Sequence, residues 1–243
     1  MFDNFSKSNT KTVGILQPGY LPWLGFFEQL YQCDIFVLYE DVQFEKGSWR
    51  NRNRIKTPIG PQWLTVPVLL KGHGFPLIKD VEVNSSVRWQ NKHIKAIIQN
   101  YSRTPFFGLY ADGLFEILGR PWKYLIDLDL ELTHWIAKQL NISTPIVLSS
   151  NLGVPGSNVQ RLIDIVHLLG GNRFYEGSAG KNYIDIRIFE QSGIEVTFQD
   201  YQHPGYPQPY GDFVSHLSIV DLIFNCGPES LNILLMSKQE ENV

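Results

Sequence analysis

The segment from residue 13 to residue 39 constrains the fold more than any other part of the chain. Residues 13–16 (V-G-I-L) are a short apolar run that predicts a buried strand, and the turn Q-P-G-Y-L-P ends it. Pro22 suits the first turn of a helix, and apolar side chains then follow at helical spacing. Residues 34–39 (D-I-F-V-L-Y) predict a second strand. A strand, a helix and a second strand in succession close right-handed on a parallel sheet.

The last hundred residues return to the same alternation, with predicted strands at 145–148, 173–175 and 194–198 and helices at 159–169, 186–191 and 219–225. The predicted fold class is therefore α/β, with a Rossmann-like, mostly parallel sheet flanked by helices. We expect one domain over 12–236, with a small β-rich insertion at 41–85 and a helical segment at 86–140, and whether that segment is a separate subdomain stays open. Residues 1–11 are expected to be disordered and 237–243 to be frayed.

Two details of the helical segment are also predicted. Trp89, Ile97 and Ile98 belong to one apolar stripe of a helix. Asp129 falls on the early turns of a helix over 125–140, where the helix dipole favours an acidic side chain.

Charge and cysteine content exclude several classes of protein. The 21 Lys and Arg nearly balance the 24 Asp and Glu, and the net charge of -3 disfavours nucleic acid as a partner. Cys33 and Cys226 are too few for a disulfide framework, suit a reducing compartment and lie in apolar surroundings typical of buried thiols. The polar first twelve residues lack a signal peptide's apolar region, and no apolar run approaches the ~20 residues that span a bilayer, which predicts a soluble cytoplasmic protein. No motif typical of a metal site is present, and none requires a cofactor.

Four segments gather polar and aromatic residues where predicted strands end: 17–23, 41–56, 175–183 and 201–210. Ligands of open α/β sheets bind outside the carboxyl ends of the strands, so we expect the four segments to converge on one cleft. In the first, two prolines and a glycine hold Gln17, Tyr20 and Trp23 rigidly at the end of the first strand. The alternative is a structural turn whose aromatic rings fill the core.

The second segment is a local basic patch, and it holds five cations, Lys46, Arg50, Arg52, Arg54 and Lys56. Arginine binds phosphate with two parallel hydrogen bonds, and Asn51 and Asn53 suit sugar hydroxyls, so a diphosphate-linked small molecule is the predicted ligand. Asp41 and Gln43 open the same segment. A solvated surface loop, or a loop that contacts RNA, is the alternative interpretation.

The remaining two segments add a possible anion site and a possible base. Residues 177–181 (G-S-A-G-K) resemble half of a phosphate loop, with Lys181 as a point charge and Asn182 and Tyr183 beside it. The proline-rich run Y-Q-H-P-G-Y-P-Q-P-Y at 201–210 is predicted to be a rigid loop that presents His203 as a general base. A polar histidine without a chemical role is the alternative.

These motifs together resemble the WbqC-like protein family. The resemblance rests on Q-P-G-Y-L-P-W-L-G-F-F at 17–27, D-V-Q-F-E-K at 41–46, N-R-N-R-I-K at 51–56, E-G-S-A-G-K-N-Y at 176–183 and Y-Q-H-P-G-Y-P-Q at 201–208. Such proteins are associated with gene clusters for O-antigen, the polysaccharide of lipopolysaccharide. That association implies a nucleotide-linked sugar, often an amino sugar, as the substrate.

A weaker resemblance concerns the fold alone. Residues 19–26 lie where adenylyl-transferring enzymes of the pantothenate synthetase type carry H-x-G-H after their first strand, but Trp23 and Phe26 replace both histidines. The fold class is therefore the only property that this resemblance implies.

The sequence thus predicts an enzyme of surface-polysaccharide biosynthesis that acts by group transfer on a nucleotide-linked sugar. One alternative is an ATP-dependent ligase that activates an acyl or aminoacyl group, and the other is a non-catalytic scaffold with a large exposed apolar patch. The predicted catalytic residues are His203, Asp41 and Gln17. The predicted binding residues are Tyr20, Trp23, Gln43, Lys46, Asn51, Arg52, Lys181, Asn182, Tyr183, Tyr206 and Gln208.

Overall fold

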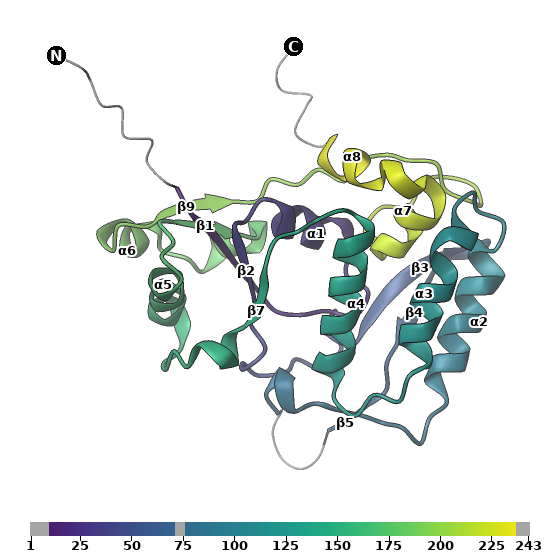
Figure 1. Ribbon diagram of the computed structural model, residues 1–243, viewed down its shortest axis with the longest axis horizontal. Helices are drawn as coiled ribbons and strands as arrows, with labels where there is room; N and C mark the ends of the chain where they lie inside the picture. Colours follow the sequence, from purple (N-terminus) through teal and green to yellow (C-terminus); the bar gives the residue numbers. More distant parts are fainter. Residues whose placement is uncertain (1–9, 71–75, 237–243) are drawn as a thin grey trace.

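The centre of the protein is a five-stranded sheet in which all neighbouring strands are parallel (Figure 1). The computed structural model describes residues 10–70 and 76–236, so most of the predicted disordered N-terminus and all of the predicted frayed tail lie outside the described residues. The strand order is β7-β2-β1-β8-β9, which confirms the predicted Rossmann-like α/β fold. The strands are β1 (Thr12–Leu16), β2 (Ile35–Leu38), β7 (Ile146–Leu148), β8 (Arg173–Glu176) and β9 (Glu195–Phe198).

Both faces of the sheet are buried, as a parallel sheet requires. On one face, Val13 and Phe174 pack in a small core with side chains of α5 (Asn158–Leu168) and α6 (Ile186–Gln191). On the other face, Phe36 packs in a larger core with α1 (Leu24–Tyr31). Alternate residues of β1 and β2 supply the two cores because successive side chains of a strand point to opposite faces.

The larger core continues from the α1 face into the helical part of the chain. This part contains α2 (Trp89–Tyr101), α3 (Phe107–Gly119), α4 (Leu125–Gln139), α7 (Ile219–Cys226) and α8 (Ser230–Leu235). Trp89 and Ile97 are buried in it as predicted, but Ile98 is 42 % exposed, because it lies one residue around the helix from the buried stripe. Asp129 lies on an early turn of α4, as predicted, but its side chain is fully buried in the core. The helix dipole therefore does not account for an acidic residue at this position.

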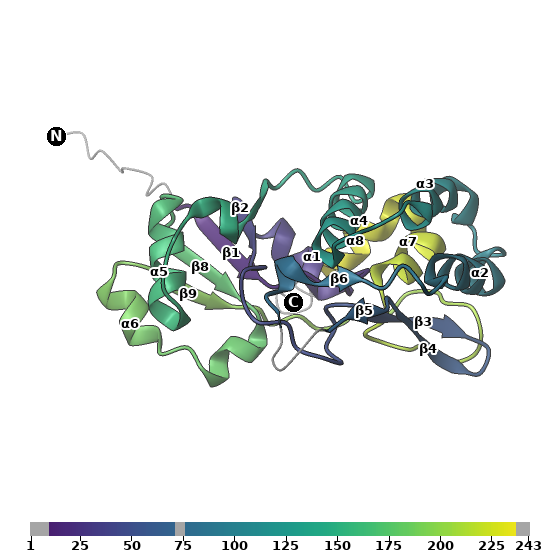
Figure 2. The ribbon, with the colours of Figure 1, turned by 90° about the horizontal axis from the view of Figure 1, so that it is seen from below.

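The residues between β2 and α2 form two small antiparallel pairs. Strands β3 (Arg52–Thr57) and β4 (Gly60–Thr65) make a hairpin, and β5 (Val68–Leu69) pairs with β6 (Glu82–Val83). The predicted strand through residues 63–68 is divided in two around Pro67, which has no N–H to donate to a ladder. Figure 2 shows the hairpin on the side of α2 and α3, with β1 and α1 between it and the α5 and α6 end of the molecule.

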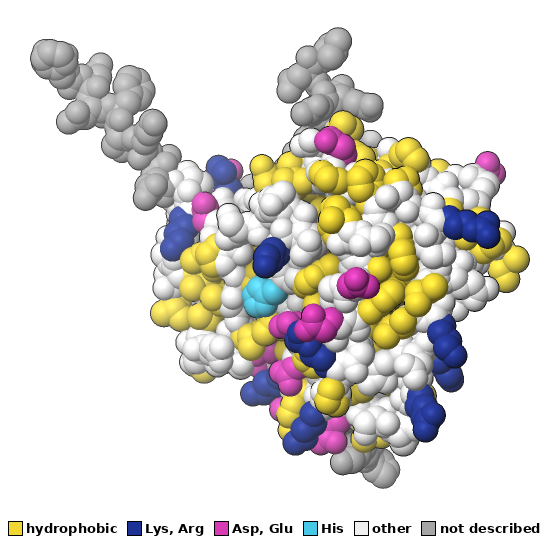
Figure 3. Space-filling model, turned by 45° about the vertical axis from the view of Figure 1, so that its right-hand side comes forward, with side chains coloured by type: hydrophobic (Ala, Val, Ile, Leu, Met, Phe, Trp, Pro, Cys, Tyr) yellow, Lys and Arg dark blue, Asp and Glu magenta, His cyan; other side chains and the backbone are white. Residues whose placement is uncertain are grey.

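The surface carries charges of both signs. On the face shown in Figure 3, acidic and basic side chains are interspersed, and apolar side chains gather in patches between them. Cys33 and Cys226 are buried and free, as predicted. Among residues 10–70 and 76–236, no helix combines the length and the apolar character needed to cross a membrane.

Candidate functional site

The strand order reverses between β1 and β8. From β1 the chain moves through β2 to β7 on one side, and β8 and β9 then extend the sheet on the other side. In open α/β sheets, ligands bind in the crevice outside the carboxyl ends of the strands at such a reversal. A ligand site is therefore expected at the residues just beyond β1.

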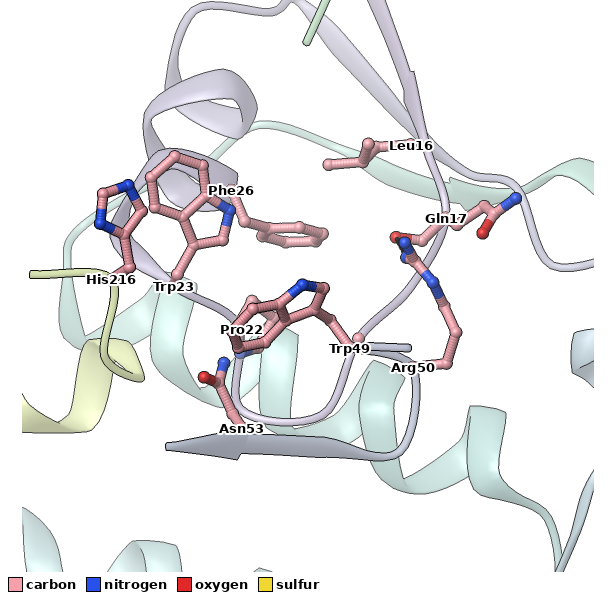
Figure 4. Close-up of a pocket in the computed structure, with 10 residues that line it drawn as sticks. Leu16, Gln17, Pro22, Trp23, Phe26, Trp49, Arg50, Asn53 and His216 are labelled. Carbon is pink, nitrogen blue, oxygen red and sulfur yellow. Dashed lines mark hydrogen bonds between the residues drawn. The ribbon is translucent and has the colours of Figure 1, made fainter. Parts of the chain in front are cut away.

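A cavity of about 300 Å³ opens at the carboxyl end of β1 (Figure 4). Its size is at the lower end of the range of about 300–1,000 Å³ that is usual for small-molecule sites. Three stretches far apart in the sequence supply its walls, namely β1 with the start of α1, the approach to the β3–β4 hairpin, and the residues before α7. The lining residues are Leu16, Gln17, Gly19, Pro22, Trp23, Phe26, Trp49, Arg50, Asn53 and His216.

The loop after β1 is fixed to the hairpin by backbone hydrogen bonds. The Tyr20 N–H donates to the carbonyl oxygens of Trp49 at 3.3 Å and Arg50 at 3.1 Å. A Cβ atom at Gly19 would lie 3.1 Å from the Trp49 carbonyl oxygen, so the absence of a side chain permits this approach.

The side chain of Arg50 also holds the loop after β1 in place. Its Nη1 donates to the carbonyl oxygens of Gln17 at 2.8 Å and Pro18 at 2.7 Å. Burial lowers the pKa of Arg50, and the negative charges of Asp129 and Glu45 act against this shift. Arg50 therefore brings a positive charge to the cavity wall and also holds the loop that forms the wall.

The alternation R-N-R-N-R at residues 50–54 has a direct structural reason. Asn51 and Asn53 point inward and are buried, and their amide nitrogens donate to the carbonyl oxygens of Val66 and Leu21 at 2.8 and 2.7 Å. The arginines point to the opposite side because side chains alternate along a strand. The predicted sugar-binding amide of Asn51 is thus used within the fold.

Two side chains at the cavity offer polar groups together with an aromatic surface. His216 stacks on the indole of Trp23, with ring centroids 5.4 Å apart and planes inclined by 15°. Its Nδ1 lies 2.8 Å from the Ser215 hydroxyl oxygen. The side-chain amide of Gln17 has no hydrogen-bond partner within the described part of the chain, so it is available to a ligand.

His203 lies directly behind the cavity wall, with its ring centroid 5.4 Å from that of His216. Its Nδ1 lies 3.0 Å from the Pro204 carbonyl oxygen, which can only accept, so Nδ1 carries the proton and Nε2 keeps a lone pair. Nε2 is buried and has no partner among the described residues. Burial lowers the pKa of His203, which favours the neutral form that a general base needs.

The structure places other predicted site residues in the interior. Tyr20 is fully buried, and its hydroxyl lies 2.8 Å from Nδ1 of His93, so its ring offers no surface for stacking. Tyr206 is buried, and Gln208 donates from its amide nitrogen to Asp221 at 2.8 Å. These two residues hold the proline-rich loop against α7.

Asp41 lies beyond β2 and is held by its neighbours. One carboxylate oxygen accepts from Arg161, and the other lies 2.5 Å from the Ser149 hydroxyl oxygen. These two hydrogen bonds keep the pKa of Asp41 low although its burial acts to raise it. The arrangement joins β2, β7 and α5 at this edge of the sheet.

The remaining predicted residues lie apart from the cavity. Lys181, Asn182 and Tyr183 are exposed on a short helical turn after β8, and Gln43 and Lys46 are exposed between β2 and β3. Arg52 stacks on Trp63 of the hairpin, and neither Arg52, Lys181 nor His203 lines the cavity. The first two of the four segments therefore meet there, while the third and the fourth contribute no lining residue. The fourth segment only approaches the wall, through the contact of His203 with His216.

Glu176 is a further titratable group near the reversal of strand order, at the end of β8. It is buried, and one carboxylate oxygen accepts from the Gly177 N–H at 2.9 Å and from the Tyr183 hydroxyl at 3.3 Å. Burial raises its pKa to about 7. The sequence alone does not mark Glu176 as a candidate, because only the fold shows that this glutamate is buried.

His216 is a second functional candidate that the sequence alone does not indicate. Its position results from an isolated β-bridge between Trp23 and Ser218 and from a hydrogen bond that Arg54 Nη2 donates to the His216 carbonyl oxygen at 3.1 Å. No local motif marks it. Trp49 and Arg50, in contrast, lie within the basic segment that the sequence did single out.

Changing Gly25 to alanine should disturb the cavity wall. A Cβ atom at this position would overlap the six-membered ring of Trp23, so the indole must leave its stack on His216. We expect Gly25→Ala to lower the free energy of unfolding by about 1–3 kcal/mol in a urea titration. Gly108→Ala is the matched control, because nothing lies within 4 Å of its added Cβ. Equal stability of the two variants would contradict this account of Gly25.

Fold and site together define an α/β protein with a small-molecule cavity at the end of its first strand. The chain belongs to the WbqC-like protein family, whose model matches residues 17–233. It is 35 % identical over 231 residues to "Uncharacterized protein Rv1507c" of Mycobacterium tuberculosis (strain ATCC 25618 / H37Rv), an alignment that covers 94 % of this chain and 100 % of that protein. No solved structure matches the chain.

Proposed function

We propose that the protein is a transferase of bacterial surface-polysaccharide biosynthesis that acts on a nucleotide-linked amino sugar. The observation that carries the proposal is the cavity at the end of β1, whose lining residues include two tryptophans, an arginine and a glutamine whose amide has no partner among residues 10–70 and 76–236. This set of groups matches a sugar ring attached to an anion. The family resemblance of the sequence motifs points to the same class of substrate.

Each side chain at the cavity has a role in this proposal. The faces of Trp23 and Trp49 receive the apolar face of the sugar ring, and Gln17 binds its polar substituents. Arg50 holds negative charge where the sugar joins the nucleotide. Hydrogen bonds of Tyr20 and Arg50 hold the cavity wall in place before a ligand binds. Binding therefore requires little further ordering of the wall, which favours affinity.

The two histidines are the proposed route for the proton that group transfer releases from the acceptor amine or hydroxyl. His216 faces the cavity, and His203 behind it carries the unprotonated Nε2. Asp41 is proposed to position strands β2 and β7, since Arg161 and Ser149 already occupy its carboxylate.

Thermal unfolding with added ligands tests the proposal. We expect UDP- or dTDP-amino sugars at millimolar concentration to raise the melting temperature by several degrees, since a hundredfold excess over Kd stabilises by about 2.7 kcal/mol. Trp23→Leu should abolish the shift. Trp135→Leu on α4, away from the lining residues, is the matched control and should retain it. No shift with any sugar nucleotide would refute the proposal, and protection by ATP alone would favour the ligase instead.

A further inference from the structure

The outward face of the β3–β4 hairpin carries a row of arginines and tryptophans that the cavity alone does not use. We infer that this row binds the nucleoside diphosphate part of the ligand while the attached sugar enters the cavity. The inference rests on the proposed function and adds the orientation of the substrate. We call the row the arginine–tryptophan strip, and it consists of Trp49, Arg50, Arg52, Arg54 and Trp63.

The strip follows from strand geometry. Arg54 is paired with Trp63 in the ladder between β3 and β4, and the alternation along the strand places Arg52 and Arg54 on one side. Arg50 lies two residues before β3 and joins the row at the cavity wall. The guanidinium carbon of Arg52 lies 4.3 Å from the centre of the Trp63 ring, and that of Arg54 lies 5.6 Å from Trp49 and 5.7 Å from Trp63. The two indoles are 5.0 Å apart at 44°. Cations and rings thus alternate over one continuous surface.

In the part of the chain that the structure describes, the arginines of the strip lack a direct ion-pair partner. None of its three arginines forms an ion pair with a carboxylate of the described residues, whereas Arg120, Arg161, Arg173 and Arg187 each form at least one. The three donate to backbone carbonyl oxygens instead, at Gln17 and Pro18, at Gly47 and at His216. Within the described ranges, the Nε–H of all three also lacks an acceptor. These Nε atoms are buried, so a ligand would reach the outer nitrogens of the guanidinium groups. Three guanidinium groups without an ion-pair partner among these residues are suited to a diphosphate.

The two indoles provide the surface for a base. Trp49 is 44 % exposed and Trp63 is 42 % exposed, which is high for rings of this size. A nucleobase can stack on such rings with little dependence on its identity. Neighbouring guanidinium groups stabilise the stack and simultaneously reach phosphate oxygens.

The strip is continuous with the cavity, which sets the direction of the ligand. Trp49 and Arg50 belong to both, and Figure 4 shows them in the cavity wall together with Gln17 and Trp23. The stretch from Arg50 to Arg54 spans at most about 13 Å, at ~3.3 Å per residue, which leaves room for a diphosphate and its nucleoside. The sugar end therefore lies at Arg50 and the base end at Trp63.

Titration calorimetry on the full chain with UDP, dTDP, uridine and a free amino sugar tests this orientation. We expect UDP and dTDP to bind more tightly than uridine, and their affinity to fall as salt is added. Arg52→Gln and Trp63→Leu should each weaken UDP at least about tenfold, since a charge-assisted hydrogen bond or a base stack is worth that much or more. Arg88→Gln and Trp135→Leu are matched controls and should leave the affinity unchanged. Both strip residues are half-exposed, and a melt of each free variant verifies that it folds.

The outcomes separate the strip from the proposed function. Sugar nucleotides that bind equally well to wild type and to both strip variants would overturn the strip and leave the cavity proposal intact. UDP that binds through the strip, without any gain from an attached sugar, would support the strip and contradict the proposed function. A single-stranded oligonucleotide that binds more tightly than UDP and is lost in the same variants would overturn the assignment to a nucleoside diphosphate.

Discussion

Replacing Asp221 with alanine should lower the free energy of unfolding by about 3–5 kcal/mol, the usual result of breaking a buried charged network. Asp221 is fully buried in α7, and its two carboxylate oxygens accept from the Tyr101 hydroxyl at 2.7 Å and the Gln208 amide at 2.8 Å. Lys56 lies close enough to attract it, and its Nζ donates to the Gln208 side-chain oxygen at 3.2 Å. Without the carboxylate, the Tyr101 hydroxyl and the Gln208 amide lose an acceptor in the interior, and Lys56 loses a nearby opposite charge.

Urea unfolding at neutral pH, followed by circular dichroism, measures the effect. Asp112→Ala is the control, because Asp112 is exposed on α3 and should change stability by less than about 0.5 kcal/mol. Asp221→Ala should also weaken ligand binding, since Gln208 anchors the loop that leads to His216. If the two aspartate variants were equally stable, the network would not hold the loop.

The second large effect is expected at Asp129 and depends on pH. Both carboxylate oxygens are buried without a hydrogen-bond partner among the described residues, and burial raises the pKa of this group well above its ordinary value, although Arg50 acts against the shift. The folded state therefore holds the proton more tightly than the unfolded state. Stability should fall as the pH rises from about 4 towards the folded-state pKa, by up to about 1.4 kcal/mol per pH unit.

Asp129→Asn removes this titration, so its free energy of unfolding should decline less than that of the wild type between pH 4 and pH 8. Asp127→Asn, exposed on the same helix, is the control and should follow the wild-type profile. Glu176 is also buried with a raised pKa, so it too lowers the free energy of unfolding as the pH rises. This contribution is the same in the wild type and both variants, so it cancels when their profiles are compared. Parallel profiles of wild type and Asp129→Asn would show that Asp129 does not hold its proton in the fold.

The sheet was predictable because hydrophobic periodicity reports directly on strands and helices. The run at 13–16 and the spacing of Leu24 and Phe27 predict β1, α1 and their parallel connection, and the structure confirms them. The burial of Asp129, in contrast, could not be predicted from periodicity. Its position on an early helical turn is visible in the sequence, but the helix face that enters the core depends on packing against other helices.

The site was predictable only in part for a similar reason. The loop with Gln17 and Trp23 and the basic segment were recognised, and both supply walls of the cavity. The basic segment was treated as a loop, so the alternation that separates buried Asn51 from outward Arg52 was not used. Tertiary contacts decide the rest, since they bury Tyr20 and bring His216 to the wall.

The bridge between Trp23 and Ser218 joins the start of α1 to the residues just before α7. During synthesis, the N-terminal part of the cavity emerges early, but its last wall appears only when the residues before α7 have left the ribosome. A product that stops short of α7 therefore lacks a closed cavity, even where its first strands have formed. Closure of the cavity should consequently report that the chain has been made and assembled up to the start of α7.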